Sequence, residues 1–258
     1  MRLKKLLTIA IVIAVGLCAV AVARDWRSGI AWTEPKAITP SETLGGAPSD
    51  AIVLFDGKDT SEWENQKWKI VDGALVAGNG DNRTKKKFGS VQLHLEFAIP
   101  ANNKNGQAAG NSGVYLSSKY EVQILDSFPG KSTYFDGQCG SIYKQRPPQV
   151  NACKKAGEWQ TYDIVFNRPK MQIENGKIKK IIRPAYITVF HNGTLIINHH
   201  ELEGATGYDN KPTYEPHEDL MPLQLQDHGT PVKFRNIWIR EIPDDNTKPK
   251  QEREPYYN

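Results

Sequence analysis

The feature that most constrains the fold is a repeated alternation of short apolar runs with turns, which extends from residue 51 to residue 242. In residues 91–98 every second side chain is apolar, and this period of two predicts a strand with one buried face. Further runs of this kind lie at residues 52–55, 68–71, 74–76, 114–116, 120–125, 160–166, 187–191, 194–198, 223–226 and 232–239.

The turns between these runs carry their own signal. Asp72-Gly73 and Asn192-Gly193 each separate two apolar runs, and such pairs favour the two-residue type I′ turn of a β-hairpin. Asn175-Gly176 lies within a charged segment and predicts an inserted hairpin. Residues 24–258 show no sustained helical periodicity. The sequence therefore predicts an all-β sandwich or jelly roll.

The first residues predict export. Arg2, Lys4 and Lys5 precede an uncharged, largely apolar stretch over residues 6–22, and the segment ends in Ala21-Val22-Ala23. A basic start, an apolar middle and a small-x-small site are typical of a cleaved signal peptide, here residues 1–23. A membrane anchor is the alternative, although the stretch is shorter than the roughly 20 residues that span a bilayer. We expect a periplasmic or secreted protein without a stable membrane span after cleavage.

The rest of the chain divides into three parts. Residues 24–50 are rich in Pro, Gly, Ser and Thr and predict an N-terminal arm or linker, residues 51–242 one β-sandwich domain, and residues 243–258 a polar tail. The whole chain has 33 basic and 29 acidic residues, and three of the basic ones lie in the signal peptide. The nearly neutral remainder indicates no nucleic-acid partner. The oligomeric state stays open.

Two cysteines follow the signal peptide, Cys139 and Cys153. In an exported protein they can form a disulfide, but two free buried thiols are the alternative. The sequence has no C-x-x-C pair, and the histidines show no ligand spacing, so no residue is assigned as a metal ligand.

Two polar clusters on strands are candidates for a sugar site. Glu121 and Gln123 share one face of the strand at residues 120–125, whereas Asp126 falls on the opposite face. A carboxylate and an amide on one face can bind hydroxyls or transfer protons, but the same pattern fits a solvated outer face. Gln226 and His228 share a face of a later strand, together with Gln224.

His228 is a candidate acid or base near neutral pH, or a turn cap with Asp227. Arg235 can pair with a substrate oxygen or with a buried carboxylate. Asn111 lies in a tight turn that can line the mouth of a site. Tyrosine and tryptophan side chains suited to stacking on a sugar are Tyr115, Tyr120, Tyr143 and Trp159.

Ordered motifs across residues 51–242 resemble the 3-keto-disaccharide hydrolase family. They are Leu54 to Asp59 with Trp63, Trp68 to Leu75, Phe88-Gly89 with Leu93 to Phe97, Asn111 to Tyr115, Tyr120 to Asp126, Gly140 to Tyr143, Gly157 to Trp159, His191 to Gly193, Leu225 to Gly229 and Phe234 to Ile237. The resemblance implies a concanavalin-like and laminarinase-like jelly roll of two curved antiparallel sheets.

The resemblance also implies a chemistry. Laminarinase-type enzymes carry a Glu-x-Asp-x-x-Glu strand, whereas this chain has Gln123 between Glu121 and Asp126, which argues against an ordinary two-carboxylate mechanism. A ketone at carbon 3 of a glucosyl unit acidifies the proton on carbon 2 and opens another route. We expect Glu121 and His228 to be the catalytic acid/base pair.

The remaining candidate residues are expected to bind the substrate. They are Asn111, Tyr120, Gln123 and Gln226 for hydroxyls, and Arg235 for the enolate. The cofactor stays undetermined, with a divalent cation as the alternative to Arg235. The predicted function is therefore an exported hydrolase of glycosidic bonds in 3-keto-glucosides or related disaccharides. A non-catalytic carbohydrate-binding module of the same fold is the alternative, and an ordinary endo-glucanase is disfavoured by Gln123.

Overall fold

The computed structural model describes residues 34–102, 104–131 and 133–243, and its described residues from Ala37 onward form one compact unit. The predicted signal peptide (1–23) and all of the predicted tail beyond Pro243 lie outside the described residues, as does the first part of the predicted arm. Residues 37–50 belong to the compact unit. There the carbonyl of Gly45 accepts hydrogen bonds from Asn236 Nδ2 and Trp238 Nε1, each at 2.9 Å.

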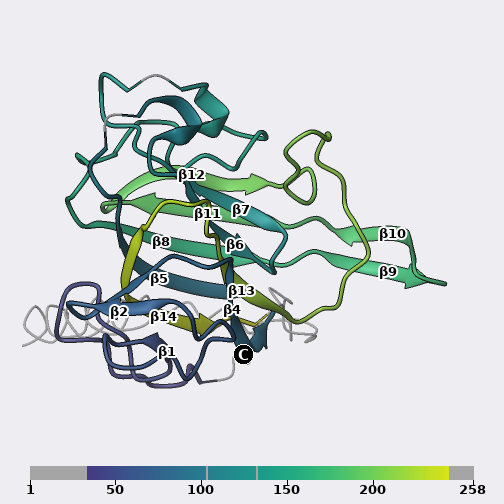
Figure 1. The fold of residues 1–258 in the computed structure, drawn as a ribbon. Helices are drawn as coiled ribbons and strands as arrows, with labels where there is room; N and C mark the ends of the chain where they lie inside the picture. Colours follow the sequence, from purple (N-terminus) through teal and green to yellow (C-terminus); the bar gives the residue numbers. More distant parts are fainter. Residues whose placement is uncertain (1–33, 103, 132, 244–258) are drawn as a thin grey trace, which may run out of the picture. The chain divides into compact units, whose positions relative to one another are not determined.

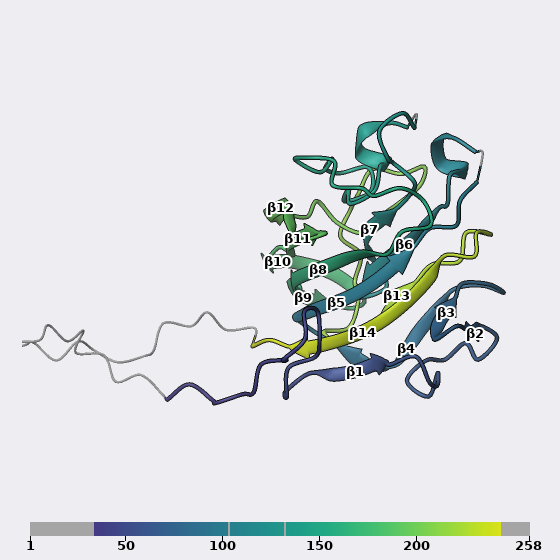
Figure 2. The same ribbon diagram turned by 90° about the vertical axis from the view of Figure 1, so that its left-hand side faces the viewer.

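Two large antiparallel sheets and a separate two-stranded hairpin build the unit (Figures 1 and 2). The larger sheet has eight strands in the order β12-β11-β8-β5-β14-β3-β2, with β1 paired to β14, and the smaller has four in the order β4-β13-β6-β7. Figure 2 shows β14 as a long curved ribbon with β1 and β3 on one side of it. The strands are β1 Ile52–Phe55, β2 Lys69–Val71, β3 Ala74–Val76, β4 Asn82–Phe88, β5 Val91–Ala98, β6 Ser112–Leu116, β7 Tyr120–Ile124, β8 Gln160–Asn167, β9 Lys170–Glu174, β10 Lys177–Arg183, β11 Tyr186–His191, β12 Thr194–Glu201, β13 Met221–Leu225 and β14 Lys233–Glu241.

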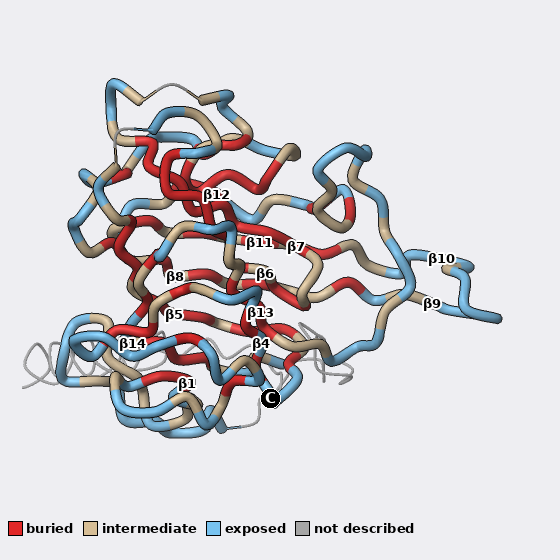
Figure 3. The backbone as a smooth tube through the Cα atoms, viewed as in Figure 1, coloured by how far each residue is buried: buried red, intermediate tan, exposed pale blue. Residues whose placement is uncertain are grey.

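The inward faces of the two sheets share one hydrophobic core, which appears as the buried centre of Figure 3. Leu93, Leu95 and Phe97 of β5 are all fully buried in it, which confirms the period-two pattern of that strand. Tyr162 of β8 crosses the core and donates a hydrogen bond from its hydroxyl to the Gln123 carbonyl at 2.7 Å. This buried bond fixes β7, the strand of the small sheet that carries Glu121.

The hairpin turns form where the sequence predicts them. Asp72-Gly73, Asn175-Gly176 and Asn192-Gly193 all have positive φ at both residues, with values between 51° and 75°. These values are those of the type I′ turn, whose twist matches that of the flanking strands. The turn at residues 175–176 joins β9 to β10, a two-stranded hairpin that projects from the rest of the molecule in Figure 1.

One strand, β4, is not predicted from the sequence patterns. β4 is the edge of the small sheet, yet its sequence is rich in polar residues and includes Lys85-Lys86-Lys87. Its buried residues are Asn82, Thr84 and Phe88, so two of its three inward positions are polar and the apolar alternation is lost. Exposed lysines on an edge strand discourage pairing with a second sheet.

Two long connections, those after β5 and after β7, lie at the top of both Figure 1 and Figure 2. The connection after β5 contains a short 3-10 helix, η1 (Gly106–Ala108), and the one after β7 contains η2 (Phe135–Gly137). The fold is a jelly-roll β-sandwich, as the sequence predicts. No helix among the described residues is long and apolar enough to cross a membrane.

Candidate functional site

The small sheet turns one face toward the core and the opposite face toward a pocket. Along β7, Tyr120, Val122 and Ile124 point into the core, so the alternation places Glu121 and Gln123 on the pocket face. Strand pairing extends this face sideways, because Tyr115 of β6 lies opposite Glu121, and Gln224 of β13 lies opposite Tyr115.

The chain segment after η2 adds a further neighbour to this row. Ile142 forms an isolated bridge with Val122, and the amide of Tyr143 donates to the Glu121 carbonyl at 3.4 Å. Tyr143 therefore lies beside Glu121 on the side of β7 away from Tyr115. Both tyrosine side chains line the pocket together with the carboxyl group of Glu121.

Loops close over this face and leave a pocket of about 350 Å³. The loops come from the connections after β5, β7, β12 and β13. The connection after β12 starts at the opposite end of the large sheet from the connection after β5, and it passes the turn between β6 and β7, where the Thr206 amide donates to the Lys119 carbonyl at 2.8 Å. The pocket is lined by Gln107, Asn111, Tyr115, Glu121, Gln123, Tyr143, Thr206, Tyr208, Gln226 and His228.

Glu121 is the chemically most unusual residue of the pocket. Its side chain is only 3% exposed, and burial raises its pKa to about 8. A hydrogen bond with Tyr115 lowers the pKa and the charge of Asp81 raises it, but burial is the largest cause. Glu121 therefore carries its proton at neutral pH, and a carboxyl group in that state can act as a general acid.

The two tyrosines beside Glu121 stay neutral. Burial, reinforced for Tyr115 by the negative charge of Glu121 and for Tyr143 by the hydroxyl of Tyr134, raises the pKa of both phenols well above the usual value. They keep their O–H groups at neutral pH and can serve there as hydrogen-bond donors. Gln226 Nε2 donates to the Tyr115 hydroxyl at 3.3 Å, so this hydroxyl is held by groups on either side of it.

Gly113 leaves the room that the Glu121 carboxyl occupies. A Cβ atom at Gly113 would lie 2.4 Å from Glu121 Oε1 and 2.9 Å from the ring of Tyr115. Distances this short cannot be tolerated without displacing the carboxyl group or the ring. The glycine is therefore part of the site, although it has no side chain to bind with.

Amide side chains form the polar wall of the pocket. Gln107 Oε1 accepts hydrogen bonds from Gln123 Nε2 at 3.2 Å and from Asn111 Nδ2 at 3.3 Å. The Oε1 atoms of Gln123 and Gln226 are buried and have no hydrogen-bond partner among the described residues. Buried acceptors are normally paired, so these two oxygens suit a ligand that brings hydroxyl donors.

His228 also lines the pocket, from the loop that follows β13. Strand β13 ends at Leu225, and His228 follows in an exposed bend that the Gly229 amide stabilises by donating to Asp227 Oδ1 at 2.9 Å. The imidazole nevertheless lines the same pocket as Glu121. The structure thus brings together seven residues that the sequence singles out: Asn111, Tyr115, Glu121, Gln123, Tyr143, Gln226 and His228.

Two of the expected binding residues lie elsewhere. Tyr120 is only 1% exposed and belongs to the core, and its hydroxyl is 2.9 Å from Nε2 of His217. Its place follows from the alternation of β7, which sends Tyr120 to the face opposite Glu121. Arg235 is on β14 of the large sheet, where its Nε donates to Glu96 Oε2 at 2.7 Å and its guanidinium lies over Trp159. We therefore remove Tyr120 and Arg235 from the candidate site.

Several pocket residues come from loops and carry no strand pattern. Gln107 lies in η1, and Thr206 and Tyr208 lie in the connection between β12 and β13. The Thr206 hydroxyl accepts a hydrogen bond from the Glu121 amide at 3.1 Å, which ties that loop to the floor of the pocket. Only the folded arrangement shows that these loops reach Glu121.

No group of three or more His, Cys, Asp or Glu residues that could hold a metal ion occurs in the described part of the chain. Cys139 and Cys153 are both buried and free. The sequence left a disulfide and two free thiols open, and the structure has the thiols.

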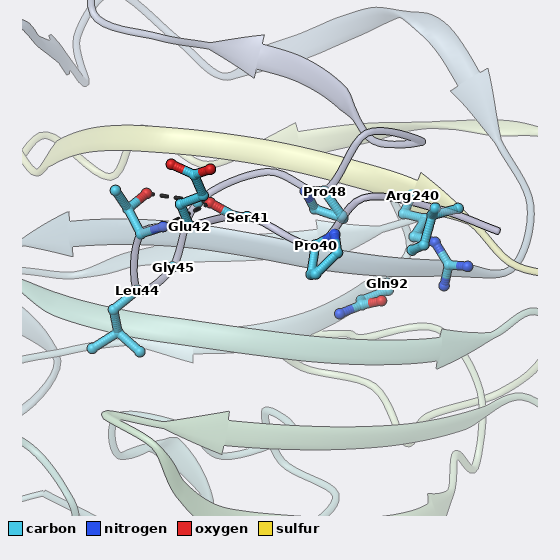
Figure 4. Close-up of a pocket in the computed structure, with 11 residues that line it drawn as sticks. Pro40, Ser41, Glu42, Leu44, Gly45, Pro48, Gln92 and Arg240 are labelled. Carbon is cyan, nitrogen blue, oxygen red and sulfur yellow. Dashed lines mark hydrogen bonds between the residues drawn. The ribbon is translucent and has the colours of Figure 1, made fainter.

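A larger hollow of about 580 Å³ lies between the N-terminal arm and the large sheet (Figure 4). Two of the polar groups here are engaged within the protein: Arg240 Nε donates to Asp50 Oδ2 at 2.7 Å, and Ser41 Oγ accepts from the Thr43 amide at 3.2 Å. Leu44 is fully exposed. The lining of this hollow includes only Glu42 and Gln92 as further carboxyl or amide side chains, whereas the pocket around Glu121 has four amide side chains, a carboxyl and an imidazole, so this hollow is the weaker candidate.

Comparison with known proteins identifies the kind of domain that carries this pocket. The family model described as a 3-keto-alpha-glucoside-1,2-lyase-like domain matches residues 50–240. The chain belongs to this family. The family description and the similar solved structures indicate a carbohydrate-active protein of the glycosyl hydrolase kind, which agrees with a pocket rich in amide and hydroxyl groups.

Solved structures support the assignment. A protein of Parabacteroides distasonis ATCC 8503, named "putative glycosyl hydrolase", is 42% identical, with 83% of this chain and 94% of that chain covered and a TM-score of 0.76. Two further proteins of the same organism and name are each 21% identical, with TM-scores of 0.54 and 0.56, 75% and 74% of this chain covered, and 94% and 99% of theirs. These two show the fold alone. No curated protein matches the chain.

Proposed function

We propose that the protein cleaves the glycosidic bond of 3-keto-glucosides by elimination and hydration. The observation that carries this proposal is the single carboxyl group of the pocket. Among the described residues that line it, Glu121 alone is acidic, and this group holds a proton at neutral pH. Ordinary retaining and inverting glycosidases need two carboxyl groups about 5 to 9.5 Å apart across the bond, and the pocket offers one.

A 3-keto sugar removes the need for the second carboxylate. The ketone makes the proton on carbon 2 acidic, and we assign its removal to the imidazole of His228. The electron pair moves toward carbon 1, the bond from carbon 1 to the glycosidic oxygen breaks, and Glu121 donates its proton to that oxygen. Water then adds to carbon 1 of the enone and a proton returns to carbon 2, so the net reaction is hydrolysis.

The neutral hydrogen-bond donors of the pocket support this route. Removing the proton on carbon 2 places negative charge on the oxygen at carbon 3, and donors that are already oriented stabilise such a charge. The phenols of Tyr115 and Tyr143 line the pocket beside Glu121 and stay protonated. They take the role that the sequence assigned to Arg235. The buried amide oxygens of Gln123 and Gln226 accept the hydroxyl groups of the sugar ring.

The proposal is tested by incubating the purified protein with 3-keto-trehalose and with trehalose and following free sugars by mass spectrometry. We expect 3-keto-glucose from the oxidised substrate alone. Replacing Glu121 with Gln should reduce the rate by about 10² to 10⁴, the usual contribution of a general acid. Full turnover by Glu121→Gln would remove this residue from the mechanism. Binding of either sugar without cleavage would instead indicate a carbohydrate-binding module of the same fold.

We also propose that the protein acts outside the cytoplasm. The support is the sequence of residues 1–23, with its basic start, apolar middle and small residues at positions 21 and 23. Expression in a bacterial host followed by N-terminal sequencing of the periplasmic protein tests this. A mature chain that begins at Arg24 is expected, and an uncleaved chain in the membrane fraction would contradict it.

A further inference from the structure

A second hollow lies next to the candidate active site. It has a volume of about 620 Å³ and shares Tyr208 with the pocket around Glu121. Its walls come from the loop that contains η2 and from the loop between β12 and β13. They consist of Tyr134, Asp136, Lys144, Glu203, Tyr208, Asp209, Asn210, Lys211 and Pro212.

Two aromatic rings in this hollow are open to solvent. The side chain of Tyr208 is 70% exposed and that of Tyr134 is 41% exposed. We call these two residues the tyrosine shelf. Large aromatic side chains contribute most when they are covered, so two exposed rings beside a polar pocket are suited to a ligand that covers them.

The shelf is fixed to the pocket through its own contacts. The Lys144 ammonium lies 4.3 Å from the centre of the Tyr208 ring and also donates to the Tyr208 carbonyl. The two hydroxyls of Tyr134 and Tyr143 are 2.6 Å apart, and Tyr143 lines the pocket beside Glu121. Each shelf ring is therefore positioned by a residue that is itself anchored.

The two loops are also joined below the shelf. Gln145 Nε2 donates to the Gly204 carbonyl at 3.1 Å, and the amide of Glu203 donates to Gln145 Oε1 at 2.9 Å. A surface that is already ordered loses little conformational entropy when it binds. With Lys144 against one face of the Tyr208 ring, the other face is the one available to a ligand.

The size of the inner pocket indicates what that ligand is. A pocket of about 350 Å³ encloses one hexose ring and its hydroxyls, so the second ring of a disaccharide must lie outside it. The tyrosine shelf is the adjoining surface, because Tyr208 lines both hollows. Aromatic faces suit the apolar C–H face of a pyranose ring. The carboxyl and ammonium groups around the shelf can bind its hydroxyls.

We propose that the tyrosine shelf binds the leaving-group sugar, so that the protein is selective for 3-keto-disaccharides over 3-keto-glucosides with a small leaving group. This proposal rests on the proposed function, since it places the 3-keto ring in the pocket of Glu121. The shelf then determines which glycosides are cleaved and takes no part in the proton transfers.

The test compares two substrates in the wild type and in three variants, one of which is a control. The ratio of KM for methyl 3-keto-α-glucoside to KM for 3-keto-trehalose is measured for the wild type, Tyr208→Ala and Tyr208→Phe. We expect Tyr208→Ala to lower this ratio about tenfold, the size expected for losing one stacked ring, and Tyr208→Phe to restore it. Phe135→Ala is the matched control, because Phe135 is 78% exposed, adjoins Tyr134 in sequence and lines neither hollow.

The possible outcomes distinguish failure of the shelf proposal from failure of the proposed function. If the wild type cleaves 3-keto-trehalose but Tyr208→Ala leaves the KM ratio unchanged, the shelf proposal is wrong and the proposed function stands. If the wild type cleaves neither substrate, the proposed function fails, and calorimetry with trehalose and methyl α-glucoside then tests the shelf. A preference for trehalose that is lost only in Tyr208→Ala would support the shelf, and equal affinities throughout would overturn it.

Discussion

Replacing Glu121 with Gln should stabilise the protein relative to the wild type, by an amount that grows as the pH rises from 4.5 to 8. In the folded protein the Glu121 carboxyl is buried, and its pKa is raised from the ordinary value of 4.5 to about 8. Between these two values the unfolded chain releases that proton and the folded protein keeps it. The folded state then binds more protons than the unfolded state, so the free energy of unfolding falls as the pH rises.

The size of the effect follows from the two pKa values. Each pH unit between them costs about 1.4 kcal/mol, so Glu121 lowers the free energy of unfolding by about 3 kcal/mol at pH 7 and by almost nothing at pH 4.5. Gln has nearly the same shape and no proton to release. Glu121→Gln should therefore match the wild type near pH 4.5 and exceed it by about 3 kcal/mol at pH 7.

Urea unfolding at pH 4.5, 6, 7 and 8 measures this difference, with equal m-values as the check that both proteins unfold to the same extent. Glu64→Gln is the matched control, because Glu64 is exposed and its replacement should leave the pH dependence of the wild type unchanged. A Glu121→Gln protein that is less stable than the wild type at pH 7 would refute the reasoning, since it would mean that Glu121 is buried as a stabilised anion.

Further predictions concern the site and the thiols. The rate of cleavage should fall as the pH rises through about 8, where Glu121 loses its proton, and a pH–rate profile of kcat/KM measures this. Gly113→Ala should lower kcat about 100-fold by displacing the Glu121 carboxyl, whereas a fully active variant would show that the carboxyl position is unimportant. His228→Asn should lower the rate of cleavage by at least about 100-fold. Because His228 is exposed, this replacement should change the free energy of unfolding by less than about 0.5 kcal/mol, and thermal unfolding detects any larger loss. Cys139 and Cys153 should resist an alkylating reagent in the folded protein and both react after unfolding without reductant, whereas a persistent mass deficit of two hydrogens would indicate a disulfide.

Local patterns predict the strands of this protein because both sheets share one core. A strand with one buried face must alternate, and in β5 Val91, Leu93, Leu95 and Phe97 show this alternation, while the Asp-Gly and Asn-Gly turns have backbone preferences of their own. β4 could not be predicted in this way, since Asn82 and Thr84 occupy inward positions where an apolar residue is expected.

The same argument limits what the sequence says about the site. Alternation along β7 separates Glu121 and Gln123 from the core residues, so these two side chains could be predicted to share a face. The same alternation also places Tyr120 in the core, which contradicts the expectation that Tyr120 binds the substrate. Gln107 and Tyr208 come from loops without periodicity, and only long-range contacts bring them to Glu121.

The central claim is that bond cleavage begins with removal of the proton on carbon 2. Cleavage of 3-keto-trehalose in deuterium oxide tests it directly, with the product analysed by NMR at early times. The elimination and hydration route predicts one deuterium at carbon 2 in essentially every molecule of 3-keto-glucose released. The product incubated alone for the same time supplies the background exchange. Released 3-keto-glucose that carries no more deuterium at carbon 2 than this background would contradict the account.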